Sequence, residues 1–259
     1  MKELLVKPVR YAVPALDKAL DVLEFLASQT RPLTQAEIAQ GLGRSANEIY
    51  RILVNLEGRG YLIRDEVSGG YRISLKLYNL SHGIEPIALI RQVALPHMED
   101  LAVQLGVSCY LSILYQSQTM VLIHANSPSP VSLNVREGSL FSTLNSVPGN
   151  VLLAHSNEEV KSMILAREAS YETYSDKQKH SLNKRWQAIA ETGIYSASSE
   201  LADGVYEYSA IVGAVADKVI AALTIPSLST TLIKNLDKDS VEAQVKQTAG
   251  KIAAQLSKG

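Results

Sequence analysis

The sequence predicts an α+β protein with two domains, because two capped helical segments and a polar hairpin precede a series of mostly antiparallel strands. The helices and the hairpin occupy residues 33–73, and the strand-like segments begin near residue 107. A chain of 259 residues can form two ordinary domains, and 46% hydrophobic with 20% charged residues is typical of a globular protein. We therefore expect a small domain at residues 1–74, linker helices at 75–106 and a larger domain at 107–259.

Two capping-box patterns mark helix starts in the small domain, Thr34 with Glu37 and Ser45 with Glu48. In this pattern the hydroxyl and the carboxylate bind each other's free backbone N–H groups. Residues 41–43, Gly-Leu-Gly, tolerate the left-handed backbone of a tight corner between the two helices. Apolar residues at helical spacing give each helix a buried face. They are Leu16, Leu20, Leu23 and Ala27 in a preceding helix, and Ile49, Ile52, Leu53 and Leu56 in the second capped helix.

Residues 61–64 and 70–73 are strand-like runs around a turn that contains Asp65 and Gly69. Two helices at a tight corner followed by a hairpin form a winged helix-turn-helix. The second helix of this motif reads base edges in the major groove, so we expect the protein to bind double-stranded DNA. The expected DNA-binding residues are Thr34, Gln35, Arg44, Ser45, Ala46, Asn47, Tyr50, Arg51 and Asn55 on the helices, with Arg64 and Arg72 on the wing.

Charge does not identify a nucleic-acid binder, because residues 1–74 carry ten basic and nine acidic side chains. Few neutralised phosphates should give weak binding to a single half-site, so we expect a homodimer or homotetramer on a palindromic operator. The segment 2–14, with Lys7 and Arg10, is either an arm for the minor groove or a disordered terminus. The alternative function is a protein-interaction adaptor that keeps both domains without binding DNA.

The larger domain shows a strand, helix and strand order that predicts an antiparallel sheet with helices on one side. A short helix at 75–83 and a longer one at 86–106, which Pro96 should bend or interrupt, precede it. Gly83 and Pro96 are candidate hinges or static helix ends. The expected strands are 107–115, 119–124, 131–135, 195–199, 206–215 and 218–225, with Ala216-Asp217 at the last hairpin tip, and the expected helices are 150–155, 157–167, 175–193 and 239–256.

Cys109 and His124, on adjacent expected strands, are the candidate catalytic pair. A lone cysteine in an apolar run is more often a buried hydrophobe, so we expect no enzyme activity. The other histidines lack metal-site spacing and no glycine-rich phosphate loop is present, so we expect no metal or cofactor. The single cysteine, a first segment without a signal-peptide core and the interrupted apolar runs together predict a cytoplasmic chain without a membrane span.

The chain resembles the IclR family of bacterial transcriptional regulators over about residues 13–227. The resemblance is most specific at residues 45–80, where Ile-Tyr-Arg-Ile-Leu, Gly-Tyr-Leu and then Gly-Tyr-Arg-Ile follow the family's recognition helix and wing. Val135-Arg136-Glu137-Gly138, Gly149 with Leu152-Leu153-Ala154, and Gly193-x-Tyr195 with Glu200 and Gly204 are similar to its second-domain landmarks.

This resemblance implies a winged helix, a linker helix and a GAF-like effector-binding domain. It also implies dimers through the DNA-binding half, often tetramers, and control of catabolic operons, commonly as a repressor, by a small carboxylic or aromatic metabolite. The effector-binding residues that it implies are Ser146, Val147, Gly149, Asn150, Glu200, Tyr206, Glu207 and Thr224.

Two segments depart from the family pattern. The family commonly has Thr-Ala-x-Gly-Lys where this chain has Ser146-Val147-Pro148-Gly149-Asn150, so a positive charge is missing. Tyr206-Glu207-Tyr208 stands where small residues or cysteine are usual, and residues 210–212 read Ala-Ile-Val instead of Ala-Pro-Val. If Glu207 points inward it disfavours an anionic effector, whereas strand alternation could instead send it to solvent. We therefore expect an effector that is neutral, aromatic or amine-bearing.

Overall fold

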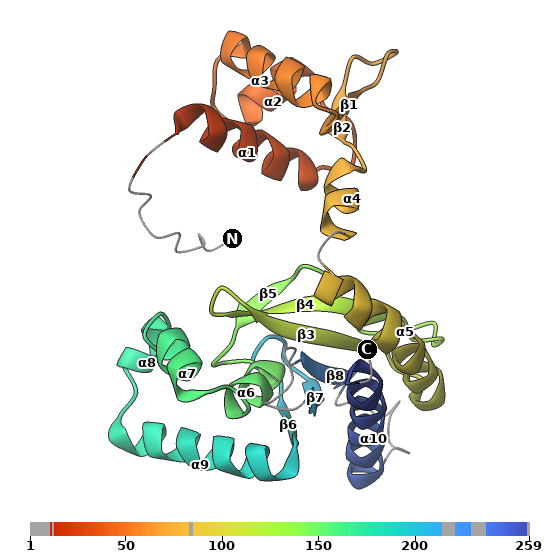
Figure 1. Ribbon diagram of the computed structural model, residues 1–259, viewed down its shortest axis with the longest axis vertical. Coiled ribbons are helices and arrows are strands. Elements are labelled where there is room, and N and C mark those ends of the chain that lie inside the picture. The colour runs from red at the N-terminus through yellow and green to blue at the C-terminus, as the bar shows by residue number, and fades with distance from the viewer. Residues whose placement is uncertain (1–10, 12, 83–84, 214–220, 229–236, 258–259) are drawn as a thin grey trace. The chain divides into compact units, whose positions relative to one another are not determined.

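A computed structural model describes residues 11, 13–82, 85–213, 221–228 and 237–257 of the chain. It divides into two compact units, residues 1–84 and 85–259, each with its own hydrophobic core (Figure 1). The expected arm at residues 2–10, the candidate hinge Gly83 and the tip Ala216-Asp217 lie outside the described residues. No described helix has both the length and the apolar character that a membrane crossing needs.

The first unit contains three packed helices and a two-stranded hairpin, as predicted. Val22, Leu26, Ile38 and Leu53 from the three helices share one buried cluster with Leu62 and Tyr71 of the hairpin. Leu62 pairs with Ile73, and Leu33 forms a further bridge to Tyr71. The elements are α1 Pro14–Ala27, α2 Gln35–Gly41, α3 Ala46–Gly58, β1 Leu62–Arg64, β2 Tyr71–Ile73 and α4 Lys76–His82.

The first capping box forms completely, whereas the second forms only in part. Glu37 accepts from the Thr34 N–H at 2.7 Å, and the Thr34 hydroxyl accepts from the Glu37 N–H. The Ser45 hydroxyl caps α3 in the same way, at 3.4 Å from the Glu48 nitrogen. The Glu48 carboxylate instead pairs with Lys18 and Arg44, so the expected return bond to Ser45 is wrong. Two cations close to Glu48 compete successfully with one backbone N–H.

The second unit is built on an antiparallel sheet whose described strands follow the order β5-β4-β3-β8-β7-β6. The expected strand at 131–135 is wrong, because the Leu133 carbonyl accepts from the Ser108 hydroxyl instead of from a neighbouring strand. A turn at Gly138, with a φ of 80°, brings Leu140 beside Met120, where the edge strand forms. The strands are β3 Cys109–Tyr115, β4 Gln118–Ala125, β5 Leu140–Ser142, β6 Ile194–Ser198, β7 Val205–Val212 and β8 Ala221–Leu228.

Helices cover both faces of this sheet, which corrects the prediction of helices on one side. The reason is that the central strands are apolar on both faces: Leu111 and Leu223 point to one face, and Leu114 and Ala222 to the other. The first face is covered by α5 Glu85–Leu105 and α10 Lys238–Leu256, and α5 continues through Pro96 without interruption. The second face is covered by α6 Val147–Ala154, with α7 Glu158–Leu165, α8 Ala169–Glu172 and α9 Asp176–Thr192 around it.

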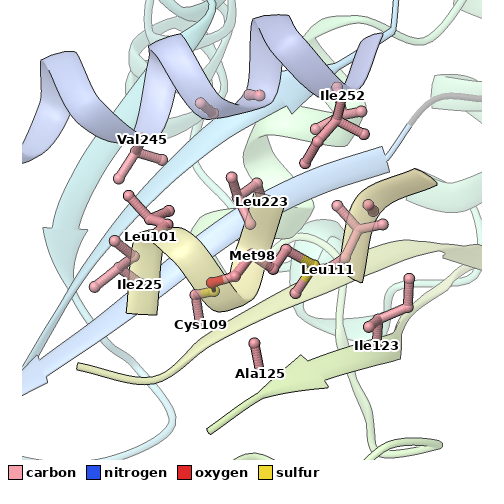
Figure 2. Packing of buried hydrophobic residues seen from close by; sticks show 14 of the residues in the cluster. Met98, Leu101, Cys109, Leu111, Ile123, Ala125, Leu223, Ile225, Val245 and Ile252 are labelled. Carbon is pink, nitrogen blue, oxygen red and sulfur yellow. Dashed lines mark hydrogen bonds between the residues drawn. The ribbon is translucent and has the colours of Figure 1, made fainter. Parts of the chain in front are cut away.

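The largest core lies between the sheet and the pair α5 and α10 (Figure 2). Met98 and Leu101 of α5 and Val245 of α10 pack over Leu223 and Ile225 of β8. These side chains are at most 1% exposed. This tightly packed core therefore makes the sheet a rigid support for the residues on its other face.

Candidate functional site

The exposed face of α3 presents four neighbouring side chains, Asn47, Tyr50, Arg51 and Val54. Their spacing of three, one and three residues places them on one side of the helix. Tyr50 is 52% exposed and Val54 46%, whereas the core side of α3 is fully buried. Arg51 makes no hydrogen bond or ion pair with any described residue. A face that combines an amide, a free guanidinium and two apolar groups can contact base edges and thymine methyl groups.

Arg44, also expected at the DNA, is held by the first unit itself. Its guanidinium lies 2.6 Å from the Asp21 carboxylate of α1 and 3.5 Å from Glu48. Lys18 also pairs with Glu48, and this hydrogen bond is the main reason that the pKa of Glu48 is lowered. The charge of Glu48, which would otherwise repel phosphate, is therefore compensated at the start of α3.

Thr34, Gln35 and Ser45 hold the two helices of the motif together. Thr34 and Ser45 are the helix caps, and the Gln35 side-chain amide donates to the Ala46 carbonyl at 2.8 Å. The two helix starts are therefore linked directly. Among the expected helix residues, the exposed side chains that take no part in these links are those of Ala46, Asn47, Tyr50, Arg51 and Asn55.

The two wing arginines lie on opposite faces of the hairpin. Arg64 pairs with Tyr71 in the ladder, and its guanidinium carbon is 5.6 Å from the centre of the Tyr71 ring. Arg72 pairs with Ile63 and is exposed on the other face. Arg72 is therefore free for a phosphate, whereas Arg64 is stacked on the domain.

In the second unit, the start of α6 is packed tightly into its surroundings. Ser146 caps the helix by accepting from the Gly149 N–H at 3.2 Å. A Cβ at Gly149 would overlap the Thr143 carbonyl oxygen. The Asn150 amide donates to two carbonyls, at 2.9 Å each, and accepts from the Trp186 indole at 3.1 Å. These side chains, with buried Val147, fix the position of α6 and leave the Asn150 amide little capacity for a ligand.

A polar row crosses the sheet on the face that α6 covers. We define the polar row as Tyr195, Ser209, Thr224, Tyr110 and His124, which are register partners across β6, β7, β8, β3 and β4. The Ser209 and Thr224 hydroxyls lie 2.9 Å apart, and both residues are fully buried. The adjacent row of partners, with Leu111 and Leu223, faces the opposite, apolar core.

Glu207 lies beside the polar row, two residues from Ser209 along β7. It is only 3% exposed, so the alternative that it points to solvent is wrong. The Tyr110 hydroxyl donates to its Oε1 at 2.7 Å, whereas its buried Oε2 has no hydrogen-bond partner among the described residues. Burial raises the pKa of Glu207, and the Tyr110 and Ser199 hydroxyls oppose that rise. An unpartnered buried oxygen of this kind costs about 1–3 kcal/mol.

The structure separates the other expected effector residues from Glu207. Tyr206 points to the opposite face of β7, where Lys238 of α10 lies 5.8 Å from the centre of its ring. Glu200 is exposed in the turn before β7. Thr224, which belongs to the polar row, lies on the same face of the sheet as Glu207.

The Cys109 and His124 pair is also separated, because the two side chains lie on opposite faces of the sheet. Cys109 is buried against α5, where its thiol donates to the Met98 carbonyl at 3.3 Å, and burial raises its pKa to about 12. His124 pairs with Tyr110, and burial lowers its pKa while Glu137 opposes that change. A thiol and an imidazole placed in this way cannot act as nucleophile and base.

Sequence reasoning missed three residues of these sites, Val54 on α3 and Tyr110 and Ser209 in the polar row, and it considered His124 only as the partner of Cys109. Val54 could have been found from its helical spacing to Asn47 and Arg51. The members of the polar row carry a local signal only as polar residues within apolar strands. Their alignment depends on the strand order and register, which become visible in the structure.

Two family models match the chain. Residues 15–66 match the IclR helix-turn-helix domain, and residues 87–254 match the C-terminal domain of bacterial transcriptional regulator IclR. The glycerol operon regulatory protein of Streptomyces coelicolor is 27% identical over 143 residues, which are 55% of this chain and 56% of that protein. The chain thus matches only about half the length of this relative. XynR, an HTH-type transcriptional regulator of Escherichia coli, is 24% identical over 84% of this chain and 87% of its own length.

Solved structures share the fold. An IclR homolog from Microbacterium hydrocarbonoxydans, complexed with 4-hydroxybenzoate, has a TM-score of 0.77 at 19% identity, covering 95% of this chain and 100% of the other. The Thermotoga maritima IclR has a TM-score of 0.73 at 18% identity, covering 93% and 98%. At these identities the likeness concerns the fold.

Proposed function

Because this chain belongs to the IclR family of bacterial transcriptional regulators, we propose that it is a sequence-specific DNA-binding regulator that responds to a small-molecule metabolite. The observation that carries the proposal is the exposed face of α3, with a free Arg51 beside Asn47, Tyr50 and Val54. A catabolic operon is the proposed target, in keeping with the relative named as a glycerol operon regulator. We propose a cytoplasmic location, since the DNA target of a bacterial regulator lies there.

In this proposal, α3 enters the major groove of an operator and Arg51 forms the strongest base contact. Arginine binds guanine bidentately, and a good contact of this kind is worth about 1–3 kcal/mol of discrimination. Asn47 lies one turn before Arg51 on the same exposed side of the helix, and the exposed residues Ala46 and Asn55 flank that side. Arg72 binds the backbone, and the caps Thr34 and Ser45 with Gln35 keep the two helix starts in place.

We further propose that two copies act together on a palindromic operator, since residues 1–74 carry almost no net charge. Apolar side chains on the surface of the first unit support a homodimer. Leu16 and Leu20 on α1 are 55% and 45% exposed, and Leu75 and Leu80, before and within α4, are 74% and 55% exposed. A second copy would remove this apolar surface from water. A homotetramer would require a further contact through the second unit.

The effector is proposed to bind the second unit on the side of the sheet that α6 covers. Glu207 and Thr224 provide polar groups there, and Ser146, Val147, Gly149 and Asn150 hold α6 in position. Binding changes DNA affinity only if the effector prefers one of two arrangements of the regulator. Along the chain, helices α4 and α5 connect the DNA-binding hairpin to the sheet of the effector-binding unit, and they are the proposed link between the two sites. No catalytic role is proposed for Cys109 or His124.

The experiment is a selection from random duplex DNA with the full-length protein, followed by anisotropy on the selected and a scrambled duplex. Arg51→Ala should weaken binding to the selected duplex by roughly 5- to 150-fold, which corresponds to about 1–3 kcal/mol, and should relax specificity at one position. Arg59→Ala removes the same charge just beyond the end of α3. It should weaken both duplexes alike and by a smaller factor.

Selection of no sequence, or an Arg51→Ala protein that binds the selected duplex as tightly as the wild type, would favour the alternative of a protein-interaction adaptor. Effector binding by the second unit would remain testable in that case, because it needs no DNA.

A further inference from the structure

We propose that Glu207 and the polar row form the recognition site for an effector that presents a hydrogen-bond donor, an ammonium or a hydroxyl group, and that this site rejects carboxylates. The proposal rests on effector binding by the second unit and names the chemical class of the effector. Glu207, Tyr110 and the Ser209 and Thr224 pair carry it.

One carboxylate oxygen of Glu207 lacks a hydrogen-bond donor among the described residues. Glu207 is 97% removed from solvent, and one oxygen of its carboxylate is satisfied by Tyr110 at 2.7 Å. The other oxygen is buried; the Ser199 hydroxyl is near enough to lower the pKa of the carboxyl, but it forms no hydrogen bond to this oxygen. Buried polar groups in proteins are almost always hydrogen-bonded, and an exception calls for an explanation. A donor that arrives with a ligand supplies the missing partner.

Glu207 also lacks a positively charged partner among the described residues. Buried glutamates are normally paired with a cation. None of the ion pairs between described residues includes Glu207. Two described basic groups of this unit are engaged elsewhere: Arg185 stacks near the Tyr195 ring, and Lys238 lies near Tyr206 on the opposite face. An ammonium group on the ligand would provide the positive charge that the described residues do not supply to Glu207.

Tyr110, which donates to Glu207, is itself held in place by burial. Tyr110 on β3 reaches Glu207 on β7 across β8, which lies between these strands, so the two side chains together span two strand spacings, about 10 Å. Tyr110 is fully buried, as are Thr224 and Ser209 beneath that path. The carboxylate is therefore oriented before any ligand arrives, which favours tight and selective binding.

The ends of the polar row extend this preference. Tyr195 is half-buried at one end, and burial raises the pKa of its hydroxyl. His124 lies at the other end, and its buried Nε2 also lacks a partner among the described residues. A carboxylate ligand would meet Glu207 without an arginine or lysine paired to that residue, and like charges at a buried site strongly disfavour binding.

The test measures ligand binding by thermal shift on the full-length protein without DNA. The probes are two matched sets, 2-phenylethylamine with 2-phenylethanol and phenylacetate, and butylamine with butanol and butyrate. The amine should raise the melting temperature most, the alcohol less and the carboxylate not at all. Glu207→Gln should weaken amine binding at least tenfold and bring carboxylate binding up to that of the alcohol.

Glu191→Gln is the matched control, because Glu191 is exposed on α9 and the same charge is removed. It should leave the ranking of the probes unchanged. Far-UV circular dichroism checks the fold of each variant, and Glu207→Met repeats the test if the glutamine variant does not fold.

The proposal is overturned if a carboxylate stabilises the wild type as well as its amine does, if Glu207→Gln keeps the wild-type ranking, or if no probe binds. Because these measurements contain no DNA, their failure is separate from a failure of operator binding. Conversely, selective amine binding by a protein that selects no DNA sequence would support this site and contradict the regulator.

Discussion

The two units of the chain use glutamate in opposite ways. In the first unit Glu37 is on the surface and fully engaged, and the hydrogen bond from Arg31, followed by those from Thr34, lowers its pKa to about 2. In the second unit Glu207 is buried, half-satisfied, and has a raised pKa. The first carboxylate completes a helix end, whereas the second retains an acceptor for a group that the described chain does not provide.

The contrast between Glu37 and Glu207 indicates that functional side chains are recognised by different properties in the two units. The first unit engages the charges of Glu37, Arg44 and Glu48 in ion pairs. It exposes Asn47, Arg51 and Val54, so exposure marks its functional side chains. The second unit buries its functional candidates, so a missing partner marks them. Both patterns fit their proposed ligands, since DNA remains outside the protein and a metabolite has to be enclosed.

We expect the greatest change from Gly149→Ala. Comparing it with Gly41→Ala tests how rigidly each unit packs around a helical glycine. Gly149→Ala should destabilise the second unit by about 3 kcal/mol, because the added methyl group meets the Thr143 backbone carbonyl, which cannot move easily. Gly41→Ala should cost about 1 kcal/mol or less, because its methyl group meets the tip of the Phe25 ring, and this partly buried side chain can swing aside about its Cα–Cβ bond. Urea unfolding followed by Trp186 fluorescence measures the former, and hydrogen exchange of α2 measures the latter.

Gly250→Ala in α10 is the control, since no atom lies within 4 Å of its added Cβ. It should stabilise the protein by up to about 1 kcal/mol through helix propensity. Equal losses for Gly149→Ala and Gly41→Ala would show that the two units do not differ in rigidity.

The next effect tests whether exposure marks a DNA contact. Val54→Ala should weaken binding to the selected duplex by up to about fifteenfold, because it removes two methyl groups and roughly 0.8 kcal/mol is lost for each group that is buried against the DNA. If the side chain packs on a thymine methyl group, replacing that thymine with uracil removes the same contact. The two changes together should then cost little more than either alone, as measured by anisotropy.

A Val54→Ala protein that binds the thymine duplex normally would remove Val54 from the reading face. Losses that add fully would place Val54 against another part of the DNA.

The smallest expected effect is the pH dependence, which should have opposite signs in the two units. The pKa of Glu37 falls from 4.5 to about 2 on folding, so its stabilisation is complete above pH 4.5 and is lost as the pH falls to about 2. The pKa of Glu207 rises on folding, so its charge costs stability at high pH and that cost disappears as the pH falls toward 4.5.

Matched glutamine variants isolate these contributions. The stability of Glu207→Gln relative to the wild type, followed by Trp186 fluorescence in urea, should be highest at neutral pH and should decrease as the pH falls. The protection of α2 in Glu37→Gln should equal that of the wild type near pH 2 and be lower above pH 4.5. A change of the same sign in both units would contradict the comparison.

Much of the fold could be predicted from local patterns. Thr34 and Ser45 cap helices where expected, and the apolar spacing of Ile49, Leu53 and Leu56 identifies the buried side of α3. These features depend on residues three or four positions apart. Predictions that depended on distant partners were less accurate, as the strand expected at 131–135 and the pairing of Glu48 with Lys18 illustrate.

The polar row marks the limit of sequence reasoning. Tyr110 and Glu207 are 97 positions apart, and their contact depends on β8 lying between β3 and β7. Glu207 could be recognised as unusual from the sequence, but its burial and its unpartnered oxygen could not. The same lack of register information made Cys109 and His124 look like possible neighbours.

The burial of Cys109 also makes the chain its own reporter of folding. It is the only cysteine in the sequence, it is fully buried between β3 and α5, and its pKa of about 12 leaves almost no thiolate at neutral pH. A thiol reagent can therefore modify the protein only when the core of Figure 2 opens. The labelling rate follows the opening of the second unit alone, so a ligand that binds there should slow labelling without any added dye or mutation.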